Sequence, residues 1–216
     1  DPEVKGSLAA QGFDQDEIKA AFSRDYDHKI FKDKPAGSSL EGYIYPETYQ
    51  ISAGGTLDEL LESSFDQFYK VLEANRIEEG LRAHNLSLFE GINLASIIQE
   101  EASEAADQPQ IAQVFLKRLR DGMVLGSDVT FMYIAGKEGR TPSVNDPSPY
   151  NTRIHDGLPP GPIANFNLSA LLAVIHPAEG DYLYFVAGDD GTIHYARTEA
   201  EHEANVAAYC HELCSE

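Results

Sequence analysis

A helix predicted near the middle of the chain carries an acidic residue on its apolar side. Ser87 and Glu90 have the spacing of a capping box, which indicates where this helix begins. At about 100° per residue, one stripe along the helix holds Leu94, Ile97, Ile98, Glu101 and Ala105. Glu101 falls near the middle of this stripe, whereas Glu100 points to one side and Glu104 lies at the margin. Because such a stripe has to be buried, the helix belongs to the main core and takes an acid into it.

An acid at a position where the pattern calls for Leu or Ile is a local inconsistency, and such inconsistencies tend to mark functional sites. A carboxyl in an apolar setting resists ionisation, so its pKa rises towards the range of a general acid. The alternative is a buried Glu101 that is paired with an arginine, or hydrogen-bonded, for structure. The helix alone leaves both interpretations open.

Periodicity and turn signals elsewhere predict an α+β fold. A second helix ends at Gly122 and forms a helical hairpin with the helix of Glu101. Capping boxes at 56–59 and 198–201 begin two further helices. Two strands on either side of a turn at 188–191 predict a small antiparallel sheet. We therefore expect a helical core, with the helical hairpin that carries the acid, and a small antiparallel sheet.

Charge and cysteine content restrict the class of protein. Asp and Glu number 36 against 16 Lys and Arg, and the net charge of −20 argues against nucleic acid or an anionic membrane surface as a partner. No apolar run is long enough to span a bilayer. Cys210 and Cys214 are expected to form a disulfide or to remain two free thiols, because a metal site with His211 between them would lack a fourth ligand. We expect no metal and no cofactor.

A proline-rich stretch at 136–169 is the longest part of the chain without regular periodicity. Loops of this length in compact domains usually have a function. Prolines stiffen the backbone, so a groove wall made of them needs little ordering when a polymer binds. Asn151 and Thr152 offer the amide and hydroxyl groups that acetamido sugars pair with. The alternative is a structural loop.

Two further segments have both a functional and a structural interpretation. Residues 40–49 are rich in tyrosine and contain Glu47, so they suit either a sugar-binding cleft or a strand at a sheet edge, where Pro46 restricts it. Asp128 is either a helix cap or a catalytic residue. His176 is either a catalytic partner or a histidine favoured by the dipole at a helix C-terminus.

Several motifs occur together in the order and spacing found in one enzyme family. They are Leu94-Ala95-Ser96-Ile97-Ile98-x-x-Glu101, Ser127-Asp128-x-Thr130, Tyr150-Asn151-Thr152, Gly157-Leu158-Pro159-Pro160-Gly161-x-Ile163, His176-Pro177 and Tyr182-Leu183-Tyr184-Phe185-Val186, with Glu41-Gly42-x-x-x-Pro46-Glu47-Thr48 before them. From about residue 40 to about residue 209, the chain resembles the endolytic murein transglycosylases of the YceG/MltG type. It departs from them at Gln99, where the family usually carries Glu.

The resemblance implies a domain division and a location. Residues 1–39 are expected to be a helical lead-in, the end of a truncated N-terminal region, and residues 40–216 a YceG-like catalytic domain. The chain begins at Asp1 without an initiator methionine, so we expect a mature or truncated piece. The resemblance implies a membrane anchor in the missing N-terminal part. The family acts at the extracytoplasmic face of the bacterial membrane. Its partners are peptidoglycan glycan strands and, for the full-length protein, cell-wall synthesis proteins.

The resemblance also implies an activity and a set of site residues. The family cuts the β-1,4 bond between MurNAc and GlcNAc within nascent strands and leaves a 1,6-anhydro-MurNAc end. Its catalytic glutamate matches Glu101. The expected substrate-binding residues are Glu47, Ser96, Asp128, Thr130, Tyr150, Asn151, Thr152, Pro159 and Pro160.

Two other functions are compatible with these residues. A hydrolytic muramidase would use Glu101 as acid with Asp128 or Glu47 as its partner, and would leave reducing MurNAc ends. A peptidoglycan-binding module would hold glycan strands without cutting them. An acid centred on an apolar stripe disfavours the binding module, because a pure binding surface has no need to bury a carboxyl.

Overall fold

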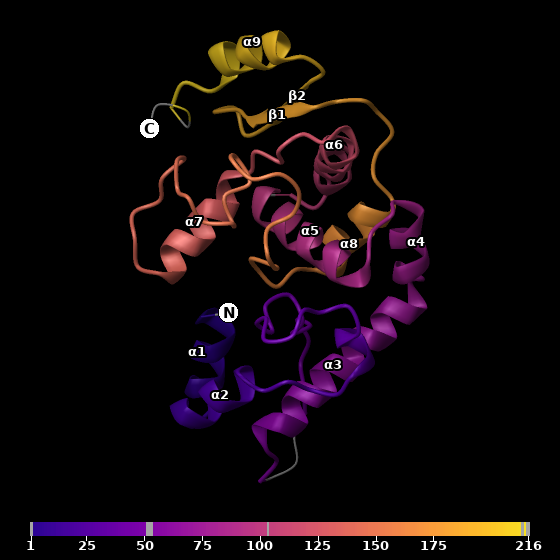
Figure 1. Ribbon diagram of the computed structural model, residues 1–216, viewed down its shortest axis with the longest axis vertical. Helices are drawn as coiled ribbons and strands as arrows, with labels where there is room; N and C mark the ends of the chain where they lie inside the picture. The colour runs from indigo at the N-terminus through magenta and orange to yellow at the C-terminus, as the bar shows by residue number, and fades with distance from the viewer. Residues whose placement is uncertain (1, 51–53, 103, 213, 215–216) are drawn as a thin grey trace.

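The computed structural model describes residues 2–50, 54–102, 104–212 and 214. The molecule is elongated, with the N-terminal helices towards one end and the β-hairpin and α9 at the other (Figure 1). In chain order they are α1 (Pro2–Ala10), α2 (Gln15–Phe22), the 3₁₀ helix η1 (Lys29–Phe31), α3 (Leu57–Ala74), α4 (Ile77–Ala83), α5 (Leu88–Glu101), α6 (Gln108–Asp121), α7 (Asp128–Lys137), α8 (Leu168–Ile175), β1 (Tyr184–Ala187), β2 (Ile193–Ala196) and α9 (Glu199–Tyr209).

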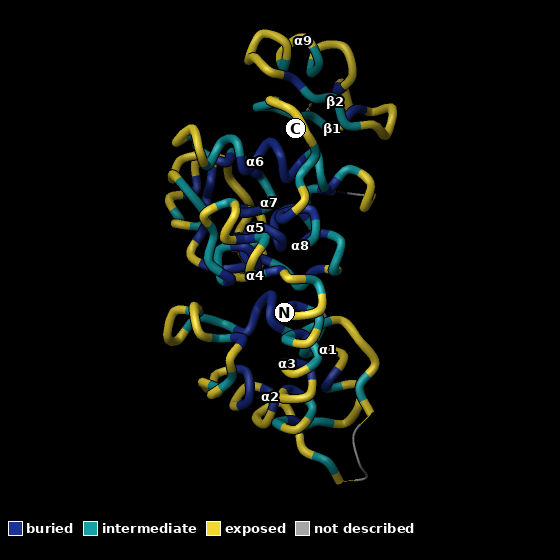
Figure 2. The backbone as a smooth tube through the Cα atoms, turned by 90° about the vertical axis from the view of Figure 1, so that its right-hand side faces the viewer, coloured by how far each residue is buried: buried dark blue, intermediate teal, exposed yellow. Residues whose placement is uncertain are grey.

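Helix α5 lies at the centre of the core. Its residues 91–98 are all buried, and α8 packs against both α5 and α6. Figure 2 shows much of this central region in dark blue, with exposed backbone in the loops around it and at the two ends of the molecule. The predicted hairpin of α5 and α6 is present, but it is closed over by α8. The sequence predicted a helix buried along one apolar stripe. Because residues 91–98 are instead buried on all sides, the helix carries apolar residues around its whole circumference there.

The local helix signals agree with the structure. Reciprocal capping boxes begin α3, α5 and α9 as predicted. Gly122 ends α6 in the left-handed conformation, with φ of 68°. One expectation about α5 was wrong: the helix ends at Glu101, because Ala102 adopts an extended backbone, and it does not continue through Ala105. Glu101 is therefore the last helical residue.

The small sheet confirms the α+β class. Strand β1 pairs with β2 in antiparallel register, with Tyr184 opposite Ala196 and Ala187 opposite Ile193. Of the two interpretations of residues 40–49, the strand at a sheet edge is wrong: these residues form a turn at 41–43 followed by irregular backbone. The Tyr45 N–H donates to Ser64 Oγ at 3.0 Å, so a side chain of α3 takes the place of a strand partner.

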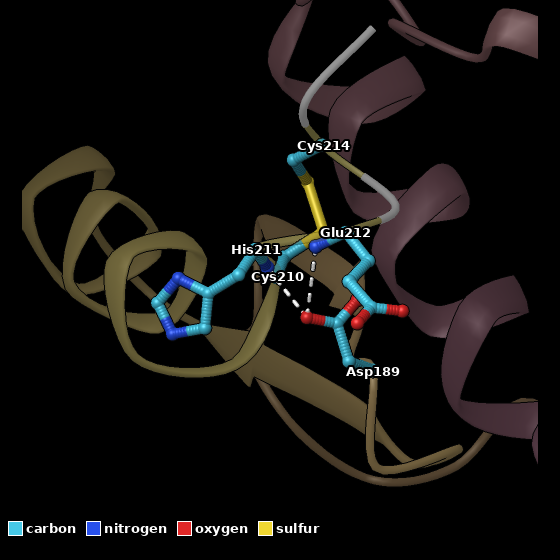
Figure 3. Close-up of a disulfide and its surroundings, with 5 residues drawn as sticks. All are labelled: Asp189, Cys210, His211, Glu212 and Cys214. Atoms are coloured by element: carbon cyan, nitrogen blue, oxygen red, sulfur yellow. Dashed lines mark hydrogen bonds between the residues drawn. A yellow bond between two sulfur atoms is a disulfide. The ribbon is translucent and has the colours of Figure 1, made fainter.

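The two cysteines form a disulfide, Cys210–Cys214, which closes the chain just after α9 (Figure 3). The carboxylate of Asp189, in the hairpin turn, accepts the backbone N–H groups of His211 and Glu212 at 2.6 and 3.0 Å. The C-terminal segment is thus tied to the hairpin. Among the described helices, none has the length and apolarity needed to cross a bilayer.

The domain division stays a prediction, although the N-terminal helices share the core. Ile18 and Phe22 of α2 belong to the same buried cluster as Phe65 of α3 and Ile92 of α5. Residues 1–39 are therefore packed against the remainder of the chain through apolar contacts.

Tight packing between α4 and α5 is testable at Gly91. A Cβ at this position would lie 2.4 Å from Leu81 Cδ2, so Gly91→Ala is expected to lower the free energy of unfolding by about 1–3 kcal/mol. Gly6→Ala, in α1 with nothing within 4 Å, is the matched control and is expected to be neutral or stabilising by up to about 1 kcal/mol. Urea unfolding followed by circular dichroism measures both, and equal effects at the two sites would contradict the packing.

Candidate active site

Glu101 meets the beginning of α7 at the C-terminal end of α5. The Ser127 hydroxyl donates a hydrogen bond of 2.5 Å to Glu101 Oε1. Ser127 is buried and holds the N-cap position of α7, but its side chain makes no capping hydrogen bond. A residue type that normally caps its own helix is thus turned towards the acid.

The surroundings of Glu101 favour its neutral form. The pKa of Glu101 is raised to about 7, chiefly by burial and in smaller part by the nearby Asp128 carboxylate. The Ser127 hydrogen bond and the charges of Arg153 and Arg118 lower the same pKa by smaller amounts. The C-terminal end of α5 adds the negative end of the helix dipole. Since Glu101 keeps part of its surface exposed, a carboxyl with a pKa near neutrality is available to a ligand.

Two threonines fix the backbone of Ser127. The Ser127 N–H donates to Thr152 Oγ1 at 3.2 Å, and the Thr130 hydroxyl donates to the Ser127 carbonyl at 2.7 Å. The two threonine hydroxyls lie 3.0 Å apart and are fully or almost fully buried. They close a polar network around Ser127, and this network sets the direction of its hydroxyl.

Arg118 fixes the loop that precedes Ser127. Its guanidinium donates to the carbonyls of Leu125 and Leu183, at 2.7 and 2.6 Å, and so joins α6 to this loop and to the segment before β1. Gly126 makes the approach possible, because a Cβ there would lie 2.7 Å from Arg118 Nη1. The same guanidinium lies 5.0 Å from the centroid of the Tyr184 ring.

An ion pair borders the site. Asp128, the first residue of α7, pairs with Arg153, and their side chains are 47% and 44% exposed. The negative charge of Asp128 raises the pKa of Glu101, and the positive charge of Arg153 lowers it. The pair therefore offers a substrate both a donor and an acceptor next to the acid.

The proline-rich loop is held along α5 by two buried polar side chains. Asn93 Nδ2 donates to the Pro159 carbonyl at 2.7 Å, and Ser96 Oγ accepts the Ile163 N–H at 3.0 Å. Asn151 holds an adjacent part of the loop, since its Nδ2 donates to the Asp146 carbonyl at 2.9 Å.

The structure brings some of the predicted site residues together and separates others. Asp128, Thr130 and Thr152 lie around Ser127 and Glu101. Four predicted substrate-binding side chains have almost no exposed surface: Ser96, Thr130, Asn151 and Thr152. Tyr150 is partly exposed, and its ring lies 5.4 Å from that of Tyr133.

The other predicted residues line two grooves that have different walls. Glu47 lines a groove of about 880 Å³ with Tyr45, Tyr49 and Glu100. Pro159 and Pro160 line another, of about 910 Å³, with Phe89 and Arg120 among their neighbours. Glu100 thus lines the groove of Glu47, whereas the adjacent Glu101 lies beside Ser127.

Gln99, His176 and the possible metal ligands have simple structural positions. Gln99 Oε1 accepts the Asn167 N–H at 3.0 Å, at the beginning of α8, and His176 is exposed at the end of that helix. Within the described ranges, no group of three or more His, Cys, Asp or Glu side chains gathers as a metal site would require.

Sequence reasoning missed the roles of Ser127, Arg118 and Arg153. Ser127 stood in a recognised motif but was not among the expected site residues. Arg153 follows the Tyr150–Thr152 motif directly, and this proximity was its only signal. Arg118 gave no signal, because an arginine in the last turn of an amphipathic helix is an ordinary surface residue.

A half-buried acid at a helix end, held by a hydroxyl and flanked by an ion pair, defines a class of site suited to acid–base chemistry on a polar ligand. A family model described as the YceG-like family matches residues 3–208. The chain belongs to this family, and the match includes the N-terminal helices α1 and α2.

The chain is similar to named relatives over most of its own length. It is 36% identical over 190 residues to the endolytic murein transglycosylase of Bacillus subtilis strain 168, covering 86% of this chain and 52% of that protein. It is 33% identical over 187 residues to the endolytic murein transglycosylase of Streptococcus pneumoniae strain D39, covering 82% and 34%. The chain therefore spans between a third and half of the length of these relatives.

A solved structure supports the fold. The 2.6 Å crystal structure of a YceG-like protein from Listeria monocytogenes matches with a TM-score of 0.70 at 30% sequence identity. The match covers 94% of this chain and 64% of the Listeria chain.

The hydrogen bond from Ser127 stabilises the ionised form of Glu101, so its removal has a predictable sign. Ser127→Ala is expected to raise the pKa of Glu101 above 7, by up to about one pH unit. Carbon-13 NMR titration of glutamate carboxyls measures this pKa, with Glu101→Gln to assign the signal. Ser63→Ala, an exposed serine of α3, is the control. An unchanged or lowered pKa in Ser127→Ala would contradict the proposed contact.

The raised pKa also links stability to pH. Folded Glu101 binds its proton more tightly than the unfolded chain does, with a pKa of about 7 against 4.5, so its burial lowers stability as the pH rises from below 4.5 to above 7. Between pH 4 and pH 8, the free energy of unfolding of Glu101→Gln is therefore expected to rise relative to the parent, by up to about 3 kcal/mol. Denaturant unfolding at both pH values measures this difference. A constant difference across this range would rule out the raised pKa.

Proposed function

We propose that this chain is the catalytic part of an endolytic murein transglycosylase. It cleaves the β-1,4 bond between MurNAc and GlcNAc within peptidoglycan glycan strands and forms 1,6-anhydro-MurNAc ends. The observation that carries the proposal is the half-buried Glu101, hydrogen-bonded by Ser127 at the end of a helix whose residues 91–98 are all buried. The relatives' name and the family membership support the choice of substrate.

The Ser127 hydrogen bond assigns the two oxygens of Glu101 different tasks. Because the hydroxyl donates to Oε1, that oxygen acts as an acceptor and the acidic proton of neutral Glu101 resides on Oε2. A proton on Oε2 is then available to the glycosidic oxygen of a bound strand. Ser127 is in this proposal a positioning residue, since it acts through Glu101.

One carboxyl suffices for the reaction. Glu101 gives its proton to the glycosidic oxygen while the bond from that oxygen to C1 of MurNAc breaks. The C6 hydroxyl of the same MurNAc attacks C1, and its proton passes to the Glu101 carboxylate, which restores the neutral acid. The attack is intramolecular, so it profits from a high effective concentration and needs no activated water. A pKa near 7 suits a group that is acid first and base second.

The other predicted residues divide into contact and positioning roles. Glu47, Asp128, Tyr150 and Pro160 have exposed or partly exposed surface and are proposed to contact the strand. Four of the predicted residues are buried: Ser96, Thr130, Asn151 and Thr152. We propose that they do not touch the sugar but position Ser127 and the proline-rich loop. Pro159 is also buried, and its carbonyl accepts a hydrogen bond from Asn93.

The proposed place of action is the extracytoplasmic face of the bacterial membrane. Disulfides persist in oxidising compartments, and the Cys210–Cys214 bond supports such a location. Cell-wall synthesis proteins are the partners proposed for the full-length protein.

Mass spectrometry of cleavage products tests this function. The chain is incubated with uncrosslinked glycan strands beside Glu101→Gln and Glu104→Gln. The parent and Glu104→Gln, which changes an exposed neighbouring glutamate, are expected to give anhydro-MurNAc ends. Glu101→Gln is expected to lose turnover by about 10²–10⁴-fold, because it has no proton to transfer.

The products distinguish the alternatives. Reducing MurNAc ends would indicate a hydrolytic muramidase, for which Asp128 is the nearby second carboxylate. Strands that bind but are not cut by any of the three proteins would indicate a binding module. Near-normal activity of Glu101→Gln would refute the assignment of the catalytic acid.

A further inference from the structure

A cavity of about 630 Å³ lies between the N-terminal helices and α7, apart from the site of Glu101. Its walls include apolar side chains from three parts of the chain, namely Ile18, Phe22, Met132 and Ile163. Three lysines, Lys5, Lys19 and Lys137, also line it, against one carboxylate, that of the buried Glu41. The cavity therefore combines an apolar surface with a cationic border.

This concentration of positive charge is unusual in an acidic chain with 36 Asp and Glu against 16 Lys and Arg. Among the residues that the structure describes, neither Lys19 nor Lys137 has an ion-pair partner, and Lys137 donates only to the Tyr133 hydroxyl, at 3.0 Å. Lys5 lies 4.9 Å from the centroid of the Phe22 ring. A ligand that carries carboxylates on a partly apolar backbone complements such a cavity in both charge and polarity.

Helix α7 connects the cavity with the candidate active site. Its first residue, Asp128, lies next to Glu101, and its last, Lys137, lines the cavity. Ten residues of α-helix span about 15 Å. In Figure 1, α7 lies beside α5, with the N-terminal helices α1 and α2 below it. The two sites are thus held at a fixed distance by one rigid element.

We propose that this cavity binds the carboxylate-bearing peptide branches of the glycan strand that Glu101 cleaves. The inference rests on the proposed function and deepens it. An extended peptide covers about 3.3–3.6 Å per residue, so a branch of four residues reaches about 13–14 Å from its sugar. This matches the length of α7. The lysines pair with the carboxylates of the branch, and the apolar walls receive its aliphatic side chains.

Kinetics with two substrates test the proposal. The chain and the variant Lys19→Glu/Lys137→Glu are given glycan strands that carry their peptides and strands stripped of them. The KM for peptide-bearing strands is expected to rise at least about tenfold in the variant, since charge reversal replaces attraction by repulsion. The KM for stripped strands and kcat are expected to stay as in the parent. Lys29→Glu/Lys70→Glu, which changes the net charge equally outside the cavity, is the control.

A binding measurement keeps this inference separate from the proposed function. Calorimetry with Glu101→Gln compares the affinity for both kinds of strand, with and without the lysine changes, and needs no turnover. If the parent cuts neither strand but the lysine changes weaken binding of the peptide-bearing strand alone, the proposed reaction fails and the peptide site stands. Equal effects on both strands, or an equal effect of the control, would overturn the peptide site. So would the absence of any effect.

Discussion

The burial of α5 on all sides over residues 91–98 is the constraint on which the remaining structure depends. A helix buried on every side has to satisfy the polar side chains that it takes with it. Asn93 and Ser96 meet this requirement by binding backbone groups of the proline-rich loop. The loop that the sequence suggested as a groove wall is therefore fixed by the core itself. Gly91 belongs to the same constraint, because only a residue without a side chain lets Leu81 pack against the helix.

At the C-terminal end of α5, burial changes the acidity of Glu101. Glu101 is the last helical residue, so its carboxyl leaves the core where α7 and the loop before it begin. Removing a carboxyl from water is unfavourable for its charged form, and the structure compensates only in part, through one hydroxyl and two nearby guanidinium groups. The burial of Glu101 therefore lowers the free energy of unfolding at neutral pH. In return, Glu101 keeps a proton that it can transfer, and such a loss of stability is common at functional sites.

The surroundings of Glu101 are held by contacts between distant segments. Arg118 of α6 binds carbonyls before α7 and before β1, and Thr152 of the long loop binds the backbone of Ser127. Each contact uses a buried or partly buried polar group with well-defined partners, which favours a rigid site. The same rigidity extends along α7, whose far end borders the cationic cavity between α7 and α2. One helix thus relates the acid to a second surface.

The sequence by itself determined the helix boundaries given by capping boxes, the hairpin of β1 and β2, and the identity of the unusual acid. These are local signals, carried by residues three or four positions apart.

Residues 40–49 were misjudged because their tyrosines suit a strand, whereas the partner of Tyr45 is a serine of α3. Only the tertiary structure decided where α5 ends and what two side chains bind. The Ser127 hydroxyl donates to Glu101 and does not cap α7, and Arg118 binds the loop before Ser127. Ser127 and Glu101 are 26 positions apart, and Arg118 and Leu183 are 65. Contacts over such separations leave no periodicity in the sequence, because they arise when the core brings the ends of several elements together.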